Sequence, residues 1–264
     1  MATRTHARQR TLSRKPGIMG RFLVVAYGVG AYLFFVGTTF YAIGFVADFP
    51  GIKTIDGPAR SGPVLAVTVD LLLLALFAVQ HSVMARPGFK RRWTRLVPAA
   101  VERSSFVLAA TALMALLIWQ WQPIAATVWR VDAPGGRALL ALFYGAGWAM
   151  VFLSTFLLGH GEFLGLAQVV DYARKRSRTP GGFRTPSLYK TVRHPLYLGF
   201  IIAFWSAPTM TAGHLLFAAA STAYIFVGMF FEERDLVTEF GTTYREYQRR
   251  VPMLFPLLRF GRRD

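Results

Sequence analysis

Long uncharged stretches alternate with short polar segments along the chain. Five of these stretches lack charge, or nearly so, over the length of about 20 apolar residues that a bilayer requires of one helix. They cover residues 22–47, 64–85, 104–129, 138–161 and 196–231. The pattern predicts an all-α integral membrane protein.

The fifth stretch is too long for one span and too short for two full ones. Pro208 and Gly213 bound a turn-like segment near its middle. We therefore predict a fold of four transmembrane helices plus a C-terminal membrane helical hairpin. The segment 232–247, which follows the hairpin, is predicted to form a charged cytosolic helix.

The chain has 30 Lys and Arg against 13 Asp and Glu, a formal net charge of +17. Because such a charge is also typical of nucleic-acid binding, its distribution has to decide. Twenty-six of the 30 basic residues lie in the segments 4–21, 86–103, 174–193 and 234–263. In the predicted topology these segments share one side of the membrane, which is the positive-inside rule with both termini in the cytoplasm. We expect a multi-pass protein of the bacterial inner membrane that contacts membrane lipids and binds no nucleic acid.

The absence of cysteine excludes disulfides, thiolate metal sites and cysteine nucleophiles, and no metal is implied. The N-terminus begins like a signal peptide, but its apolar stretch is too long for one, so we expect it to stay attached. The chain divides into a basic, disordered N-terminus (1–20), transmembrane helices 1–4 (21–160), and a C-terminal part (161–264). That last part holds the long inner loop, the hairpin and the cytosolic helix. The sequence gives no indication of the oligomeric state.

The segment RHPLYLG, residues 193–199, stands where the inner loop enters the hairpin. Pro195 suits the first turn of a helix, where an N–H would have no partner. The positive end of the helix dipole, with Arg193 and His194 beside it, would attract a carboxylate or a phosphate. An interfacial arginine that only anchors the helix would give the same pattern.

Two adjacent carboxylates, Glu232 and Glu233, stand where the second hairpin helix emerges. At a helix C-terminus they face the negative end of the dipole, so a cation should offset them. Arg234 is one choice, and the ammonium or sulfonium of a ligand is the other. Because a hairpin brings its two ends together, it would offer an anion site and a cation site side by side. Such a pair suits an amino-acid zwitterion with a nearby positive centre.

Three segments, RHPLYLG (193–199), EERDL (232–236) and FGTTYREY (240–247), resemble the isoprenylcysteine carboxyl methyltransferase and phospholipid methyltransferase superfamily of membrane enzymes. With AVQHSVMARP (78–87) and VERS (101–104), the whole chain more closely resembles the bacterial methanethiol S-methyltransferase family, which makes dimethyl sulfide. The resemblance implies S-adenosylmethionine as cofactor, with S-adenosylhomocysteine as product, bound at the cytosolic face without a Rossmann domain. It also implies a small thiol as substrate.

The resemblance further implies which residues bind the cofactor. The hairpin entry and the paired glutamates would form one part of the pocket, through Tyr189, Arg193, His194, Pro195, Tyr197, Gly199, Glu232 and Glu233. The inner end of the fourth span would close another wall, through His160, Gly161, Phe163, Leu166 and Gln168. Gly199 would allow close approach to the cofactor.

Methyl transfer to a thiol requires the thiolate, and a free alkyl thiol is mostly protonated at neutral pH. A base or a positive field must therefore stand beside it. His81, with Ser82 beside it, and Asp70 lie in the second span, where ionisable residues are functional candidates by default. His81 and Asp70 are about 16 Å apart along a helix axis, so they cannot pair directly. Tyr244 is the fourth catalytic candidate, as a proton relay or a group that orients the thiol.

A structural role stays open for each of these candidates. His81 could bond a backbone carbonyl, Asp70 could lie close to the outer interface, and Tyr244 with Tyr247 could form an aromatic stripe that docks the cytosolic helix. Gly145-Ala146-Gly147 is a G-x-G, but it lies inside a span, so we predict close helix packing there rather than nucleotide binding.

Other functions also fit the pattern. Hydrogen sulfide is a second thiol candidate. Methylation of a lipid amine or of a prenylcysteine carboxylate would need a wider opening towards the lipid. A non-catalytic transporter or denitrification-associated membrane protein would keep the fold but bind no cofactor.

Overall fold

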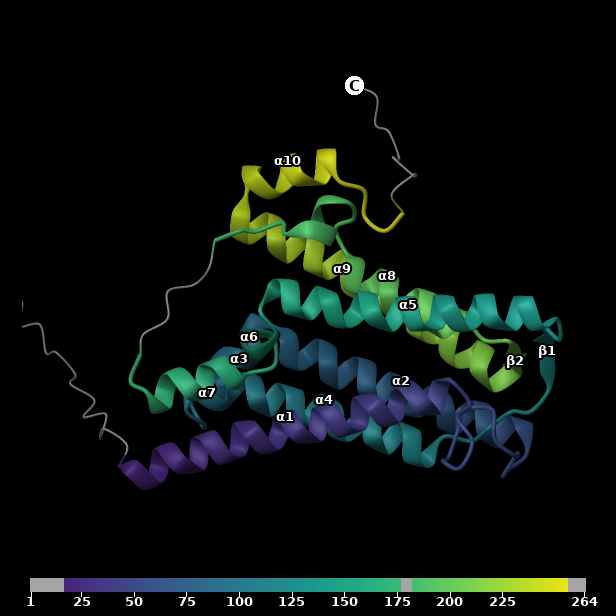
Figure 1. The fold of residues 1–264 in the computed structure, drawn as a ribbon. Coiled ribbons are helices and arrows are strands. Elements are labelled where there is room, and N and C mark those ends of the chain that lie inside the picture. The colour runs from purple at the N-terminus through teal and green to yellow at the C-terminus, as the bar shows by residue number, and fades with distance from the viewer. Residues whose placement is uncertain (1–16, 177–181, 256–264) are drawn as a thin grey trace, which may run out of the picture.

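The computed structural model describes residues 17–176 and 182–255, and this part of the chain is mostly helical (Figure 1). Five helices are long and apolar enough to cross a membrane. They are α1 (Ile18–Val46), α2 (Pro63–Ala85), α4 (Ala99–Gln120), α5 (Pro134–Leu158) and α9 (Ala212–Phe240). The protein is thus a multi-pass membrane protein of the predicted all-α class. Most of the segment 1–20 lies outside the described residues, and its last three residues already belong to α1.

Short helices gather at one end of the bundle (Figure 1). They are α3 (Pro87–Trp93), α6 (His160–Phe163), α7 (Leu166–Ala173) and α10 (Thr242–Arg250). The strands β1 (Thr127–Arg130) and β2 (Thr209–Thr211) lie at the opposite end and pair antiparallel, with Trp129 opposite Met210. Because α3, α7 and α10 contain or adjoin the basic segments, the positive charge gathers at the end with the short helices.

The predicted hairpin is present but asymmetric. Its first helix, α8 (Pro195–Trp205), has 11 residues, whereas α9 has 29 and is itself a candidate span. The turn between them falls at the predicted place and contains β2. The residues at the start of α8 lie beside the C-terminal half of α9, because Arg193 contacts Glu233 before α9 ends at Phe240.

The third predicted stretch, residues 104–129, is wrong at both ends. Helix α4 begins at Ala99 and ends at Gln120. Pro123 follows closely, and a proline restricts the residue before it to extended conformations. Residues 127–129, counted as helical from their hydrophobicity, form β1 together with Arg130 instead.

The predicted cytosolic helix over residues 232–247 is also wrong, because two helices share this segment. Helix α9 continues through both glutamates to Phe240, and α10 begins at Thr242. Gly241 between them has a φ of +57°, a left-handed conformation that favours glycine. The break turns α10 back across the end of the hairpin.

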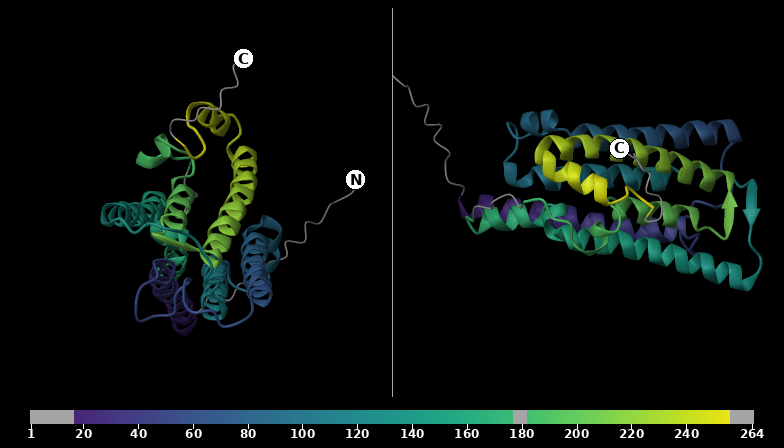
Figure 2. Two further views of the ribbon diagram at one scale, coloured as in Figure 1. Left: turned by 90° about the vertical axis from the view of Figure 1, so that its right-hand side faces the viewer. Right: turned by 90° about the horizontal axis from the view of Figure 1, so that it is seen from above.

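Helix α8 lies between α5 and α9 when the bundle is viewed along its length (Figure 2). A Cβ atom on Gly199 of α8 would lie 2.6 Å from the carbonyl oxygen of Gly147 on α5. A Cβ on Gly147 would meet the Gly199 carbonyl oxygen at 2.7 Å. These two glycines let the helix backbones touch, so the predicted packing role of the G-x-G segment is confirmed for Gly147.

Buried polar contacts hold the opposite end of the bundle together. Asp56, in the loop after α1, accepts hydrogen bonds from the Thr211 hydroxyl at 2.5 Å and from Nδ1 of His214 at 2.9 Å. Nε2 of His214 lies 3.1 Å from the carbonyl oxygen of Phe204. The buried imidazole therefore bridges Asp56 and the Phe204 carbonyl. The contact joins the α1–α2 loop to the hairpin turn.

Candidate active site

The start of α8 is fixed by the C-terminal segment. The backbone N–H of Arg193 donates to the Pro252 carbonyl at 2.9 Å, and that of His194 donates to the Met253 carbonyl at 3.1 Å. Pro195 occupies the first helical position, as predicted. The segment after α10 thus pairs with the residues that precede α8 and determines where their side chains point.

Arg193 and Glu233 form a buried ion pair where the two hairpin helices meet. Arg193 Nε donates to Glu233 Oε1 at 2.8 Å, and about 12% of each side chain is exposed. Arg193 Nη1 also donates to the carbonyl oxygens of Gln248 and Val251, at 3.0 and 2.8 Å. The predicted meeting of the two hairpin ends is therefore present.

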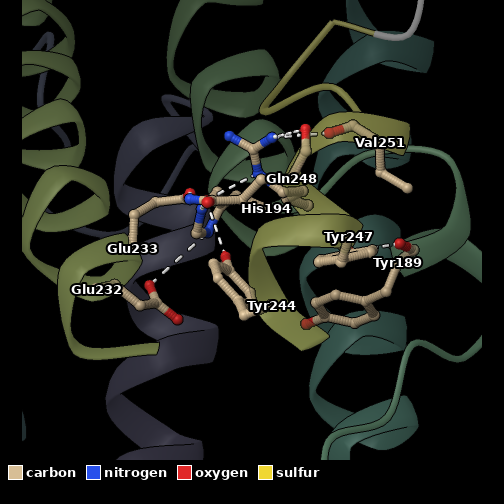
Figure 3. A network of polar contacts seen from close by, with 9 residues as sticks. Tyr189, His194, Glu232, Glu233, Tyr244, Tyr247, Gln248 and Val251 are labelled. Carbon is tan, nitrogen blue, oxygen red and sulfur yellow. Dashed lines mark hydrogen bonds and ion pairs between the residues drawn. The ribbon is translucent and has the colours of Figure 1, made fainter. Parts of the chain in front are cut away.

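Glu233 is the centre of a polar cluster that joins α8, α9 and α10 (Figure 3). Besides Arg193, its carboxylate has three partners: His194 Nε2 at 2.7 Å, the Tyr244 hydroxyl at 2.9 Å and the side-chain amide of Gln248. Arg193, His194 and Tyr244 all bond Oε1 and Gln248 bonds Oε2, so Oε1 has no capacity left for a further donor. Arg193 and Glu233 thus neutralise each other, and neither is left as the open anion or cation site that the hairpin pattern predicted.

Glu232, one residue earlier, has spare capacity. Its Oε2 atom is buried without a hydrogen-bond partner and lies 3.8 Å from Nδ1 of His194, while 44% of the side chain is exposed. The Tyr197 hydroxyl lies within hydrogen-bonding reach of this carboxylate. His194 therefore contacts both glutamates, Glu233 through Nε2 and Glu232 through Nδ1. Its ring centroid is 5.5 Å from that of Tyr197. Glu232 is the more exposed of the two carboxylates, at 44% of the side chain against 12% for Glu233.

Tyr244 and Tyr247 anchor α10 to the rest of the cluster. Tyr244 is 1% exposed and donates to Glu233, and the Tyr247 hydroxyl donates to the Tyr189 carbonyl oxygen at 2.5 Å. Phe183 packs edge-on against both rings, with centroid distances of 5.5 and 5.2 Å. Burial, followed by the nearby charge of Glu233, raises the pKa of Tyr244 well above its usual range, and burial raises the pKa of Tyr247 to about 12. Both phenols therefore stay protonated donors at neutral pH.

The segment from His160 to Gln168 contacts a different part of the bundle. His160 Nε2 lies 3.2 Å from the Tyr32 hydroxyl, and its Nδ1 lies 2.9 Å from Thr155 Oγ1. Gln168 donates to the Glu162 carbonyl at 3.0 Å. Gly161 and Leu166 pack on each other, with 3.9 Å between a Cβ built on Gly161 and that of Leu166. Among the described residues, no hydrogen bond or ring contact joins this segment to the Glu233 cluster.

His81 and Ser82 face α9 from the C-terminal end of α2. The His81 ring lies among three aromatic rings, with centroid distances of 4.8 Å to Phe106, 5.5 Å to Phe77 and 6.4 Å to Tyr224. Its Nδ1 atom is buried without a hydrogen-bond partner. Ser82 Oγ lies 3.1 Å from the Tyr224 hydroxyl. The structure therefore brings His81 and Ser82 together with α9, on the same end of the bundle as Glu232.

Asp70 and Gly199 lie away from any open site. Asp70 is fully buried near the opposite end of α2, where its Oδ1 accepts from the backbone N–H of Gln122 at 2.9 Å. Gly199 faces Gly147, so the space that its missing side chain leaves is filled by α5. Gly199 thus serves helix packing, whereas Asp70 bonds the backbone through Oδ1 and its buried Oδ2 has no hydrogen-bond partner among the described residues.

Gln248, Tyr224 and Arg103 are site residues that the sequence reasoning missed. Arg103 was counted among the topological charges of an inner loop, yet it belongs to α4, and its Nε donates to the Phe163 carbonyl at 2.6 Å. The segment VERS had pointed to this region only through overall similarity. Gln248 and Tyr224 carry no pattern of their own, because each gains its partner through tertiary contacts.

The fold and this cluster define a multi-pass helical membrane protein with a polar site where a short hairpin meets its C-terminal helix. No protein-family model and no solved structure matches the chain. It is 52% identical to methanethiol S-methyltransferase 1 of Bradyrhizobium diazoefficiens, over 89% of this chain and 83% of that protein. It is 50% identical to the methanethiol S-methyltransferase of Mycobacterium tuberculosis, over 90% of this chain and 98% of that protein. The mouse protein Nurim is a more distant relative, 27% identical over 81% of this chain.

The chain therefore belongs to the methanethiol S-methyltransferase family, which confirms the resemblance seen in the sequence.

Proposed function

We propose that this protein transfers the methyl group of S-adenosylmethionine to methanethiol, giving dimethyl sulfide and S-adenosylhomocysteine. Relatives at about 50% identity that bear the name of this activity support the reaction. The structural observation that carries the proposal is the Glu232 carboxylate, whose buried Oε2 has no hydrogen-bond partner and lies beside His194. A buried carboxylate oxygen without a partner is costly, so a cationic ligand is expected to complete the site.

The cofactor fits the donors and acceptors at the start of α8. The first intrahelical bond of α8 runs from the Leu198 N–H to the His194 carbonyl at 3.0 Å, so the backbone N–H groups of Leu196 and Tyr197 come before it. These groups, at the positive end of the helix, would hold the cofactor's carboxylate. Glu232 would hold its ammonium group or its sulfonium centre. When bound, the cofactor supplies an electrophilic methyl group on a positively charged sulfur.

Arg193, Glu233 and Tyr244 act as positioning residues in this proposal. Their hydrogen bonds to Glu233 would fix the position and orientation of the His194 ring, which lies between Glu233 and Glu232. Tyr244, considered from its sequence as a proton relay, has its hydroxyl committed to Glu233. We therefore assign Tyr244 to the support of the cofactor site rather than to the thiol.

His81 and Ser82 are the candidates for the thiol side. Methanethiol must lose its proton before its sulfur attacks, and the unpartnered Nδ1 of His81 is suited to receive that proton. The aromatic rings around His81 would exclude water from the reacting pair. Asp70 has no part in this step, because it bonds the backbone at the other end of α2.

We also propose that the end with the short helices faces the bacterial cytoplasm, as do both termini. The basic segments around α3, α7 and α10 support this orientation, because Lys and Arg gather on the cytoplasmic side of inner-membrane proteins. A cytoplasmic site would have direct access to a soluble, charged cofactor, and the apolar product would leave through the lipid.

The test is headspace gas chromatography on the purified protein in lipid nanodiscs, supplied with S-adenosylmethionine and one thiol at a time. We expect dimethyl sulfide from methanethiol, and a comparison with hydrogen sulfide and butanethiol would define the preferred size. Isothermal calorimetry with S-adenosylhomocysteine would measure cofactor binding separately. Cofactor binding without any volatile thioether would refute the thiol reaction, and no cofactor binding would refute a methyltransferase.

A further inference from the structure

Arg103 lies inside the bundle near the inner end of α4. Its guanidinium carbon is 4.9 Å from the centroid of the Phe106 ring and 5.0 Å from that of the Phe163 ring. Its Nε atom donates to the Phe163 carbonyl at 2.6 Å, which orients the guanidinium plane. An arginine keeps its charge at any physiological pH, so a fixed positive charge stands here.

No carboxylate among the described residues forms an ion pair with Arg103 within 4.0 Å. Its two terminal nitrogens donate to none of the described residues, and neither is a fully buried atom. A largely enclosed cation without a counter-charge is costly to a protein, unless a ligand supplies the negative charge. The terminal nitrogens are the donors that such a ligand would meet.

His81 shares the Phe106 ring with Arg103. The His81 and Phe106 ring centroids are 4.8 Å apart, and the guanidinium carbon of Arg103 lies 4.9 Å from the centroid of the same ring. Nδ1 of His81 is buried and unpartnered. Arg103 and His81 thus contact the same aromatic ring, one with a positive charge and the other beside an unpartnered ring nitrogen.

The residue of α9 that contacts His81 lies on a face of this helix next to the face of Glu232. Tyr224 on α9 contacts Ser82 and the His81 ring. Glu232 follows eight residues later, which is about 80° around the helix and about 12 Å along it. Tyr197 on α8 lies within electrostatic reach of both Tyr224 and Glu232. Adjacent faces of α9 therefore carry Glu232 and the tyrosine that contacts the His81 ring.

We propose that Arg103 and His81 form the acceptor subsite, in which the guanidinium binds the thiolate sulfur of a small thiol and His81 takes its proton. This inference rests on the proposed function. The S–H proton moves to the imidazole, and the sulfur's electron pair then forms the new S–CH₃ bond. The methyl group's bond to the donor sulfur breaks, and that electron pair stays on the donor, which becomes a neutral thioether. The imidazolium proton leaves to water.

The subsite explains a preference for small thiols. Phe77, Phe106, Phe163 and Tyr224 surround the two polar groups, and aromatic rings make favourable contacts with sulfur and methyl groups. A thiolate bound between rings is poorly solvated, so the charge of Arg103 has a large effect on its formation.

Two substitutions of Arg103 test the subsite, with kcat/KM measured against pH for methanethiol and for 2,2,2-trifluoroethanethiol, a small thiol made more acidic by its fluorines. In Arg103→Gln we expect kcat/KM for methanethiol at pH 7 to fall roughly 10- to 100-fold, the range for loss of a hydrogen bond to a charged group. The alkaline rise of its pH profile should move up by about one pH unit, since one unit is a tenfold change in thiolate population. The loss should be smaller for the fluorinated thiol.

Arg103→Lys keeps the charge but cannot donate to the Phe163 carbonyl in the same geometry. We expect it to restore the wild-type pH profile, even if its rate is lower. If Arg103→Gln does not fold, Arg103→Lys alone tests the proposal. An upward shift of its pH profile by about one unit would contradict a role for the positive charge. Arg92→Gln, at an exposed position of α3, is the matched control for loss of one basic residue and should leave both profiles unchanged.

The activity of the wild-type protein tests the proposed function, and the pH profile of Arg103→Gln tests the acceptor subsite separately. If the wild-type protein makes no thioether, the reaction itself is refuted. If the wild-type protein is active while Arg103→Gln keeps the same pH profile and the same ratio between the two thiols, Arg103 does not bind the thiolate. S-adenosylhomocysteine affinity should stay within about twofold in all Arg103 variants, because Glu232 and α8 hold the cofactor in the proposal.

Discussion

Glu232 and Glu233 are adjacent in sequence, yet the structure predicts opposite effects for their neutralisation. Glu233→Gln removes the negative charge that Arg193, His194 and Tyr244 share. Glu232→Gln removes a charge whose Oε2 atom has no hydrogen-bond partner in the protein. The first substitution should therefore damage the fold, and the second should damage cofactor binding.

The size of the first effect follows from the burial of the Arg193–Glu233 pair. Only about 12% of each side chain is exposed, and removal of one partner leaves the arginine charge inside the protein. Breaking a buried pair in this way costs about 3–5 kcal/mol. Because Gln248 and Val251 still accept from Arg193, we expect the lower end, about 3 kcal/mol. In a chain of this size that corresponds to roughly 6–12 °C in the melting temperature.

The assay pairs two measurements on each variant. Thermal unfolding in detergent micelles gives the apparent melting temperature, and calorimetry with S-adenosylhomocysteine gives the affinity. Glu232→Gln should stay within about 0.5 kcal/mol of the wild-type stability, because its side chain is partly exposed. It should lose at least about tenfold in affinity, which corresponds to about 1.4 kcal/mol. A destabilised Glu232→Gln beside a stable Glu233→Gln that no longer binds cofactor would reverse the assignment and refute the reasoning.

Three further predictions concern the scaffold around the site. Gly199→Ala should lower the free energy of unfolding by about 1–3 kcal/mol, because the new Cβ would lie 2.6 Å from a backbone oxygen of α5. The control Gly145→Ala, whose Cβ would have no atom within 4 Å, should leave the melting temperature unchanged. Because burial raises the pKa of Tyr247 from 10.0 to about 12, the folded protein should keep that proton while the unfolded chain loses it, so stability should fall as pH rises from 10 towards 12. After allowance for solvent screening, the wild type should lose about 1 kcal/mol more than Tyr247→Phe between pH 9 and 11, measured by thermal unfolding. Asp56→Asn should lower the free energy of unfolding by about 1–3 kcal/mol, measured by thermal unfolding, because Thr211 and the buried His214 lose their carboxylate partner.

The membrane class and the turn of the hairpin could be predicted from the sequence because both depend on local properties. Span length reflects bilayer thickness, and Pro208 and Gly213 break helices wherever they occur. The errors arose where hydrophobicity does not distinguish helix from strand. Residues 127–129 closed a long uncharged stretch, but with Arg130 they pair with β2, a partner about 80 residues away in the chain. Pro123 was the local signal that separated the two, and the hydrophobic pattern outweighed it.

The hairpin pattern in the sequence predicted that Arg193 and Glu233 would meet, and their 2.8 Å contact agrees with this prediction. It did not predict that they would satisfy each other. That outcome depends on Gln248 and Tyr244 of α10, which fold back because of a single residue, Gly241, in a left-handed conformation. A sequence pattern indicates that two charges lie at one end of a hairpin, but the third helix decides which of them remains open to a ligand.

The distinction between the two glutamates comes from helix geometry. Successive residues of an α-helix are about 100° apart, so neighbours on α9 face different surroundings although they share one sequence motif. Glu233 faces α10 and its four donors, while Glu232 lies between that face and the face of Tyr224, which packs on α2. Glu232 therefore escapes the four donors that bind its neighbour. In our proposal, Glu232 of α9 binds the positive centre of the cofactor and Arg103 of α4 binds the thiolate, so charges of opposite sign on two helices would bring the two reactants together.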